Sequence, residues 1–253
     1  MYDQMFATGM KNQWQEMVYL DLFSGSGYSQ IRGTSDILQA SPLLALQIPD
    51  RFSRYIYCDR DAENLEALRR RVERHAPGTS AAYVPGDIDE TISQVLELIP
   101  RGTSNHRVLS FCFVDPFSVD LRFSTIRRLS ERYIDFLILL ALGMDANLNL
   151  PVYIEEHHTR IEQFLDNPNW RAEWKAEEAR GKRFIPFMAQ QYAQAMMQLR
   201  YLATPLERMY LVRSDQKNLP LYYLAFFSRH RRGYDFWGEV MKYSDPQLGL
   251  SLG

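Results

Sequence analysis

The chain has 253 residues, of which 46% are hydrophobic and 24% are charged, and its formal net charge is -2. This composition is ordinary for a soluble globular protein and excludes an overall basic field of the kind that attracts nucleic acid. The longest apolar run is too short to span a bilayer, and the N-terminus lacks the apolar core of a signal peptide, so we expect a cytoplasmic protein without a membrane span.

Strand and helix patterns alternate through the first half of the chain. Apolar runs predict five strands, over residues 17–23, 54–59, 81–87, 107–117 and 134–143. Helical spacing of apolar residues predicts three intervening helices, over residues 61–76, 89–100 and 121–133. Such alternation favours right-handed βαβ units that form a doubly wound, mostly parallel sheet. The nearly continuous apolar run of 107–117 predicts a strand buried on both faces, at the centre of that sheet.

The second half carries a different pattern. Helical signals alone occupy the segment from about 147 to 203, over residues 152–166, 169–181 and 187–203. Two strands then follow, over 207–214 and 221–228, with a connection short enough for an antiparallel hairpin. A parallel sheet that ends in an antiparallel hairpin is the architecture of the Rossmann-like class I methyltransferase fold. We therefore predict one α/β domain of this fold over residues 1–253, with a helical insertion at about 147–203.

The first strand runs into a glycine turn, "DLFSGSG". In a doubly wound sheet, ligands bind beyond the carboxyl ends of the strands. Glycine there lets the backbone adopt positive φ and approach a ligand closely. Asp21, Phe23, Gly25 and Gly27 are therefore candidate cofactor-binding residues, although a plain structural turn would have the same pattern.

The helix after this turn begins late. Ser41 is its expected N-cap, with Pro42 at the first helical position, and residues 28–40 are expected to form a loop. A diphosphate cofactor needs the amide groups of a helix that starts directly after the glycines. S-adenosylmethionine has no phosphate and does not need that helix start. We therefore expect the turn to bind the methionine moiety of S-adenosylmethionine and the loop to cover it.

Acidic residues follow the next two strands. Asp59 ends the second strand, where a carboxylate can accept hydrogen bonds from both ribose hydroxyls, and Asp61 fits the N-cap of the following helix. Asp87 follows the third strand and is a candidate contact for the adenine amino group. Capping of the helix that follows is the alternative role for Asp87.

The fourth strand ends in "VDPF", which contains Asp115, Pro116 and Phe117. This sequence resembles the Asp-Pro-Pro-Tyr signature of amino methyltransferases, without its second proline. In that signature, the carboxylate and a nearby carbonyl accept the hydrogens of a planar amine and the aromatic ring stacks on the target, which orients the nitrogen for in-line attack. The alternative is a strand end that Asp115 caps and Pro116 terminates.

No metal site is expected. His157 and His158 have glutamates nearby, but adjacent residues of a helix diverge by about 100°, which favours a solvated helix. Cys58 and Cys112 lie inside apolar runs and indicate buried free thiols rather than a disulfide framework. Two tryptophans of the insertion, four residues apart, are expected in the core, with a binding surface as the alternative.

Six segments together resemble the three-Cys-motif partner proteins, from about Tyr19 to Lys242: "YLDLFSGSGYSQIRGT", "SPLLAL", "RYIYCDRDAENLEALRRRV", "GDIDE", "FVDPF" and "SRHRRGYDFWGEVMK". Their most specific pattern is S-x-x-R-G-T followed by S-P-L. The resemblance implies a bacterial protein with a methyltransferase-like fold. It also implies a partner, a radical-SAM-like protein with a three-cysteine motif.

Two functions are compatible with these patterns. The first is an S-adenosylmethionine-dependent methyltransferase that acts on an amine, with a nucleobase or nucleic acid among the candidate acceptors. The second is an accessory partner of the three-cysteine protein, built on a methyltransferase scaffold and docked through its helical insertion. Fold alone does not distinguish them.

Overall fold

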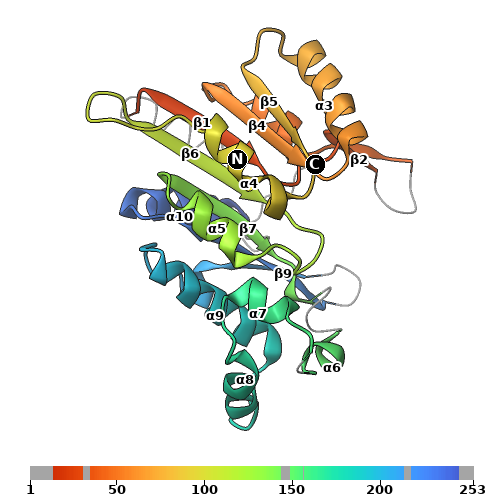
Figure 1. Ribbon diagram of the computed structural model, residues 1–253, viewed down its shortest axis with the longest axis vertical. Coiled ribbons are helices and arrows are strands. Elements are labelled where there is room, and N and C mark those ends of the chain that lie inside the picture. Colours follow the sequence, from red (N-terminus) through yellow and green to blue (C-terminus); the bar gives the residue numbers. More distant parts are fainter. Residues whose placement is uncertain (1–13, 31–34, 144–148, 156, 214–217, 245–253) are drawn as a thin grey trace.

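A computed structural model describes residues 14–30, 35–143, 149–155, 157–213 and 218–244. A twisted sheet of seven strands forms its centre, with helices on both faces (Figure 1). The five predicted parallel strands are confirmed: β1 (Glu16–Asp21), β4 (Arg54–Asp59), β5 (Ala81–Pro85), β6 (Val108–Val114) and β7 (Ile134–Leu140). The doubly wound arrangement is therefore confirmed.

The order of the strands locates the crevice where a ligand can bind. The sheet runs β5-β4-β1-β6-β7-β9-β8, so the chain moves outward in one direction from β1 and in the other from β6. β1 pairs in parallel with both β4 and β6. The carboxyl ends of β1 and β6 therefore form the topological switch point, which is where open α/β sheets bind ligands.

The predicted antiparallel hairpin closes one edge of the sheet. It consists of β8 (Tyr210–Arg213) and β9 (Pro220–Phe227), which pair antiparallel, and β9 also pairs antiparallel with β7. Residues 214–217 of the connection lie outside the described residues. The sheet is thus parallel from β5 to β7 and antiparallel at β9 and β8, as predicted.

Helices cover the sheet on two sides. The three predicted crossover helices are present as α3 (Ala62–His75), α4 (Ile88–Leu98) and α5 (Phe123–Leu129). The Asp61 side chain accepts a hydrogen bond from the Glu63 amide at 2.8 Å, which confirms its predicted capping role. A further helix, α10 (Arg231–Ser244), follows β9 and was not among the predicted elements.

Two hydrophobic cores lie on opposite faces of the sheet. Along β1, Met17 and Tyr19 belong to one core, and Val18 and Leu20 belong to the other, because successive side chains of a strand point to opposite faces. The first core packs against α3 and α10. The second packs against α4, α5 and the helices of the insertion. Cys58 and Cys112 are buried free thiols, as expected.

The described part of the insertion contains four α-helices: α6 (Leu150–Tyr153), α7 (Arg160–Leu165), α8 (Trp170–Glu178) and α9 (Phe184–Gln198). A short 3-10 helix, η2 (Leu206–Arg208), leads into β8. The single helix predicted over 152–166 is wrong, because the chain leaves the helical conformation between Tyr153 and Arg160. The Arg171 guanidinium donates to carbonyls of this segment, including that of Glu155 at 2.8 Å, which also accepts from the His158 amide at 3.1 Å.

The two tryptophans of α8 belong to the core. Trp170 and Trp174 are 0% and 3% exposed, and the Trp174 ring meets Phe184 edge-on with centroids 5.0 Å apart. Their expected burial is confirmed, and the alternative of a tryptophan binding surface is wrong. In the described residues, no helix is long and apolar enough to cross a membrane.

We predict that Trp170→Ala lowers the free energy of unfolding by about 3–5 kcal/mol, because it leaves a cavity inside a closed core. Urea denaturation measures the change. Val152→Ala, at an exposed position of α6, is the control and should change stability by less than about 0.5 kcal/mol. Equal stability of the two variants would contradict the burial of this ring.

Candidate functional site

The glycine turn after β1 adopts a conformation that favours glycine. Gly25 and Gly27 have φ of 57° and 87°. A Cβ on Gly27 would lie 2.9 Å from Leu68 Cδ1, so this glycine allows close packing on α3. A Cβ on Gly25 would meet no atom within 4 Å. The space next to the Gly25 Cα is therefore open, and the predicted contact of Gly25 with a cofactor stays a prediction.

The turn is fastened to the end of β4. The Ser24 hydroxyl donates to the Cys58 carbonyl at 3.1 Å, and the Gly25 amide donates to Asp59 Oδ2 at 2.8 Å. The other oxygen of Asp59 accepts from the Asp61 amide at 2.9 Å and from Asn64 Nδ2 at 3.2 Å. The structure thus brings Gly25 and Asp59 together, and the half-buried Asp59 carboxylate fixes the shape of the turn.

Asp21 lies beneath the turn rather than at its surface. Its side chain is fully buried and accepts hydrogen bonds from the Ser41 hydroxyl at 2.6 Å, the Tyr19 hydroxyl at 3.2 Å and the Phe23 amide at 3.3 Å. Burial raises the pKa of Asp21 to about 7, and these three hydrogen bonds limit the rise. The contacts of Asp21 show a residue that supports the turn from below.

A small hairpin delays the helix after the turn. Strand β2 (Tyr28–Gln30) pairs antiparallel with β3 (Ile37–Gln39), and α2 (Ser41–Leu46) then begins. The loop expected over 28–40 is therefore wrong, since both of its arms are strands. Residues 31–34, which include the R-G-T of the resemblance, lie outside the described residues.

Ser41 is not the N-cap of α2. Ala40 occupies the cap position without a side-chain hydrogen bond, and Ser41 is the first helical residue. The Ser41 hydroxyl donates to the buried Asp21 carboxylate instead. The predicted cap is wrong by one residue because a buried acceptor from β1 competes for that hydroxyl.

Asp87 caps α4 and also faces a cavity. Its side chain accepts from the Asp89 amide at 3.0 Å, which confirms the capping alternative. Its second oxygen forms an ion pair with Arg60 at 3.7 Å. Asp87 also lines a cavity of about 220 Å³, so capping leaves it accessible to a ligand.

This cavity lies beyond the ends of β1, β5 and β6. Its wall includes Leu22 and Phe23 after β1, Asp87 and Asp89 after β5, and Pro116 and Phe117 after β6. Four of the predicted site residues therefore share one cavity. Arg60, Asp89 and Asp120 also line it and were missed by the sequence analysis. Each follows a predicted strand end by a few residues, and that position is the signal that could have found them.

The end of β6 presents an acid and an aromatic ring. Pro116 is buried, whereas Phe117 is 90% exposed. Asp115 lies at the solvent edge, yet the surrounding protein raises the pKa of its carboxyl by desolvation. No residue in the described part of the chain donates a hydrogen bond to Asp115, so the strand-end cap considered for it is absent there.

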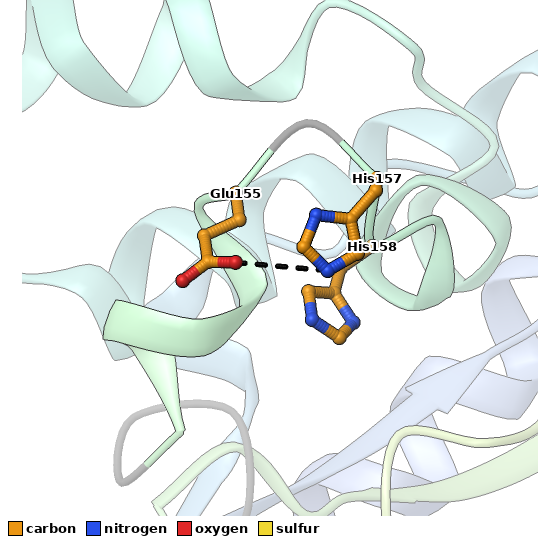
Figure 2. A group of neighbouring side chains, drawn as sticks. All are labelled: Glu155, His157 and His158. Atoms are coloured by element: carbon orange, nitrogen blue, oxygen red, sulfur yellow. Dashed lines mark ion pairs between the residues drawn. The ribbon is translucent and has the colours of Figure 1, made fainter.

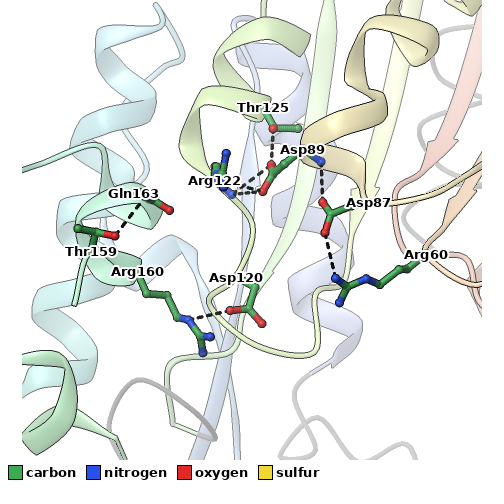
Figure 3. A network of polar contacts seen from close by, with 9 residues as sticks. All are labelled: Arg60, Asp87, Asp89, Asp120, Arg122, Thr125, Thr159, Arg160 and Gln163. Carbon is green, nitrogen blue, oxygen red and sulfur yellow. Dashed lines mark hydrogen bonds and ion pairs between the residues drawn. The ribbon is translucent and has the colours of Figure 1, made fainter. Parts of the chain in front are cut away.

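A second, polar cavity of about 380 Å³ adjoins the first, and the two share Asp87, Asp89 and Asp120. The insertion supplies its far wall through His157, His158, Thr159, Arg160 and Gln163. Figure 3 shows Arg160, the first residue of α7, facing the acidic residues of the sheet end, where it pairs with Asp120 at 2.9 Å. Arg122 pairs with Asp89 at 3.8 Å in the same network. The insertion is therefore one wall of the site region.

The chain is similar to known proteins in its fold. No protein-family model and no curated protein matches it. A Legionella pneumophila protein assigned to the family model DUF519 has a similar structure, with a TM-score of 0.52 and 9% identity over 95% of this chain and 88% of that chain. The class I methyltransferase fold is confirmed. The strand order and the antiparallel edge are those of that fold.

Two further solved structures share parts of the arrangement. One is geranyl diphosphate methyltransferase with GPP and sinefungin, at a TM-score of 0.43 and 12% identity over 90% of this chain and 78% of that chain. The other is an S-adenosylmethionine-dependent methyltransferase of Clostridium acetobutylicum, at a TM-score of 0.32 and 14% identity over 56% of this chain and 50% of that chain. The likeness to the three-Cys-motif partner proteins rests on the sequence segments alone.

We predict that Asp21→Asn flattens the dependence of stability on pH. The folded protein holds the Asp21 proton more tightly than the unfolded chain does, because burial raises the pKa from 3.8 to about 7. The resulting stabilisation is fully present below about pH 4 and is lost as the pH rises through about 7. Wild type should therefore lose more unfolding free energy over this range than the variant.

Urea denaturation at a series of pH values measures this difference. Asp235→Asn, at an exposed position of α10, is the matched control and should follow the wild-type curve. A wild-type slope in the Asp21→Asn variant would contradict the assigned titration.

Proposed function

We propose that this protein is an S-adenosylmethionine-dependent methyltransferase that acts on an amine, with a nucleobase of a nucleic acid as the first candidate acceptor. The observation that carries this proposal is the carboxylate of Asp115. It stands at the carboxyl end of the central strand, without a hydrogen bond from the described residues, beside the exposed ring of Phe117. A strand-end carboxylate in that state is available to a ligand.

The glycine turn supports S-adenosylmethionine over a diphosphate cofactor. The hairpin of β2 and β3 separates the glycine turn from α2, so among the described residues no helix begins directly after the glycines. A diphosphate would lose the amide donors that it needs. The open backbone at Gly25 leaves room for a methionine moiety, which has no phosphate and needs no helix N-terminus.

Asp59 and Asp87 would hold the nucleoside part of the cofactor. A carboxylate offers about four lone-pair positions, and protein donors occupy three of those on Asp59. The remaining position can accept a ribose hydroxyl. Asp87 lies on the cavity wall one strand further out, where it can meet the amino group of adenine.

Asp115 and Phe117 would hold the acceptor. S-adenosylmethionine, when bound, supplies the methyl group. The Asp115 carboxylate accepts a hydrogen bond from the target amine, and the Phe117 ring offers a face for a planar base to stack on. Together they orient the nitrogen lone pair towards the methyl carbon, which converts a random encounter into an in-line attack. Asp115 can take up the proton that the nitrogen releases, since desolvation raises its pKa.

We predict that Asp59→Ala weakens S-adenosylmethionine binding by about tenfold or more, because the cofactor loses a charged acceptor and the turn loses its anchor at Gly25. Isothermal titration calorimetry measures the affinity. Asp61→Ala is the control, since it removes a helix cap two residues away and should lower the melting temperature without changing affinity. Equal affinity in wild type and Asp59→Ala would reject the role of Asp59.

We predict that Asp115→Ala lowers the single-turnover rate of methyl transfer by about a hundredfold, with cofactor affinity and melting temperature nearly unchanged. The acceptor is identified first, by transfer of a radiolabelled methyl group to bacterial nucleic acid and protein extracts. A lower melting temperature with full turnover per folded molecule would show instead that Asp115 is a structural residue.

The same titration tests the alternative function. An accessory partner of a three-cysteine protein has no need of the cofactor. If wild type gives no heat with S-adenosylmethionine or with its demethylated product, the enzyme proposal fails and the accessory role stands.

A further inference from the structure

Three metal-binding side chains meet between α6 and α7. Their donor atoms, from Glu155, His157 and His158, all lie within 4.8 Å of one another. Glu155 Oε2 lies 3.6 Å from His157 Nε2, and the two imidazole rings have centroids 4.1 Å apart. Figure 2 shows the Glu155 carboxylate facing the imidazoles of His157 and His158.

The broken helix makes this convergence possible. Adjacent side chains of an α-helix diverge by about 100°, which is the premise on which the sequence analysis expected no metal. That premise is wrong for this segment, because α6 ends at Tyr153 and α7 begins at Arg160. Outside a helix, neighbouring side chains can turn to the same side.

The half-buried Arg171 side chain holds the backbone that carries the three residues. The Arg171 guanidinium donates to the carbonyls of Tyr153 at 2.9 Å, Ile154 at 3.0 Å and Glu155 at 2.8 Å, and also to that of His158. The same guanidinium lies over the fully buried Trp170 ring, 4.7 Å from its centroid. These contacts hold the backbone of this segment in place without a ligand, which lowers the backbone entropy lost on binding.

The surrounding charge favours a cation. Four carboxylates line the adjoining 380 Å³ cavity, against two guanidinium groups, those of Arg122 and Arg160. Both guanidinium groups are paired with carboxylates of the cavity, Asp89 and Asp120. The net negative field would draw a divalent ion to the histidines on the cavity wall.

We propose that Glu155, His157 and His158 bind a divalent transition-metal ion, with Zn²⁺ as the ion of choice. Imidazole nitrogens with one carboxylate oxygen suit Zn²⁺ and not Mg²⁺, which prefers oxygen ligands alone. Ligand bonds of about 2.0–2.2 Å place tetrahedral donors about 3.4 Å apart, close to the carboxylate–imidazole distance seen here. Small side-chain rotations close the remaining gaps.

Three protein ligands leave a fourth coordination position open. Because His157 and His158 line the polar cavity, this position faces the space next to the cavity that holds Pro116 and Phe117. A water molecule, or an oxygen or nitrogen atom of a ligand that enters the cavity, would complete the coordination.

Calorimetric titration of the untagged full chain with Zn²⁺, without S-adenosylmethionine, tests the site. We expect one ion per chain, at least a tenfold loss of affinity in His157→Ala and in His158→Ala, and no binding in the double variant. His106→Ala, at an exposed histidine of the opposite sheet end, is the control and should bind as wild type. Mg²⁺ should give no signal.

Co²⁺ absorption gives a second readout that reports on coordination. Wild type should show visible d–d bands that the double variant lacks, while the melting temperatures of both metal-free proteins agree. Absence of Zn²⁺ binding in wild type, or unchanged affinity in the double variant, would overturn the proposal. Because no cofactor is present, these outcomes do not depend on whether the protein is a methyltransferase.

Discussion

Parallel pairing of β1 with β4 on one side and β6 on the other is the constraint on which the site depends. Asp21 lies opposite Tyr57 of β4 and Phe113 of β6, so these three strands end at almost the same level. The residues just beyond those ends must therefore meet. Gly25, Asp59 and Asp115 are far apart in the sequence, and the common register of three strands brings them to one edge of the sheet.

Three aspartates at these strand ends have the same side chain but differ in burial and in the hydrogen bonds that they accept. Asp21 is fully buried with three donors, and desolvation still raises its pKa to about 7. Asp59 is tied by backbone amides into the turn. Asp115 has no donor among the described residues and lies next to an exposed ring. Two of these carboxylates fasten the turn, and the third accepts no hydrogen bond from the described residues.

The insertion is integrated with the sheet rather than attached to it. Its tryptophans fill the core on one face, and its α7 meets the acidic residues after β5 and β6 across a polar cavity. Arg171 connects these two roles, because its side chain lies over the buried Trp170 ring while it holds the backbone that carries His157 and His158. A substitution in the core of the insertion would therefore also shift the backbone that carries His157 and His158 in the cavity wall.

The sequence by itself determined the sheet, its antiparallel edge and the residues at the strand ends. Hydrophobic periodicity and turn residues are local signals, so strands and helices can be predicted from short stretches of sequence. The carboxyl ends of parallel strands all lie at the same edge of the sheet, so the residues that follow them are brought together. The cap at Asp61 is equally local, since its partner lies two residues away.

Only the tertiary structure decided the local features that depend on hydrogen bonds between residues distant in the sequence. Ser41 donates to Asp21 from 20 residues away instead of capping α2. The Arg171 guanidinium donates to the carbonyl of Glu155, 16 residues earlier, within the segment where periodicity predicts one continuous helix. Hydrogen bonds between residues so far apart produce no periodic pattern in the sequence. The convergence of Glu155, His157 and His158 could therefore not be predicted from their spacing.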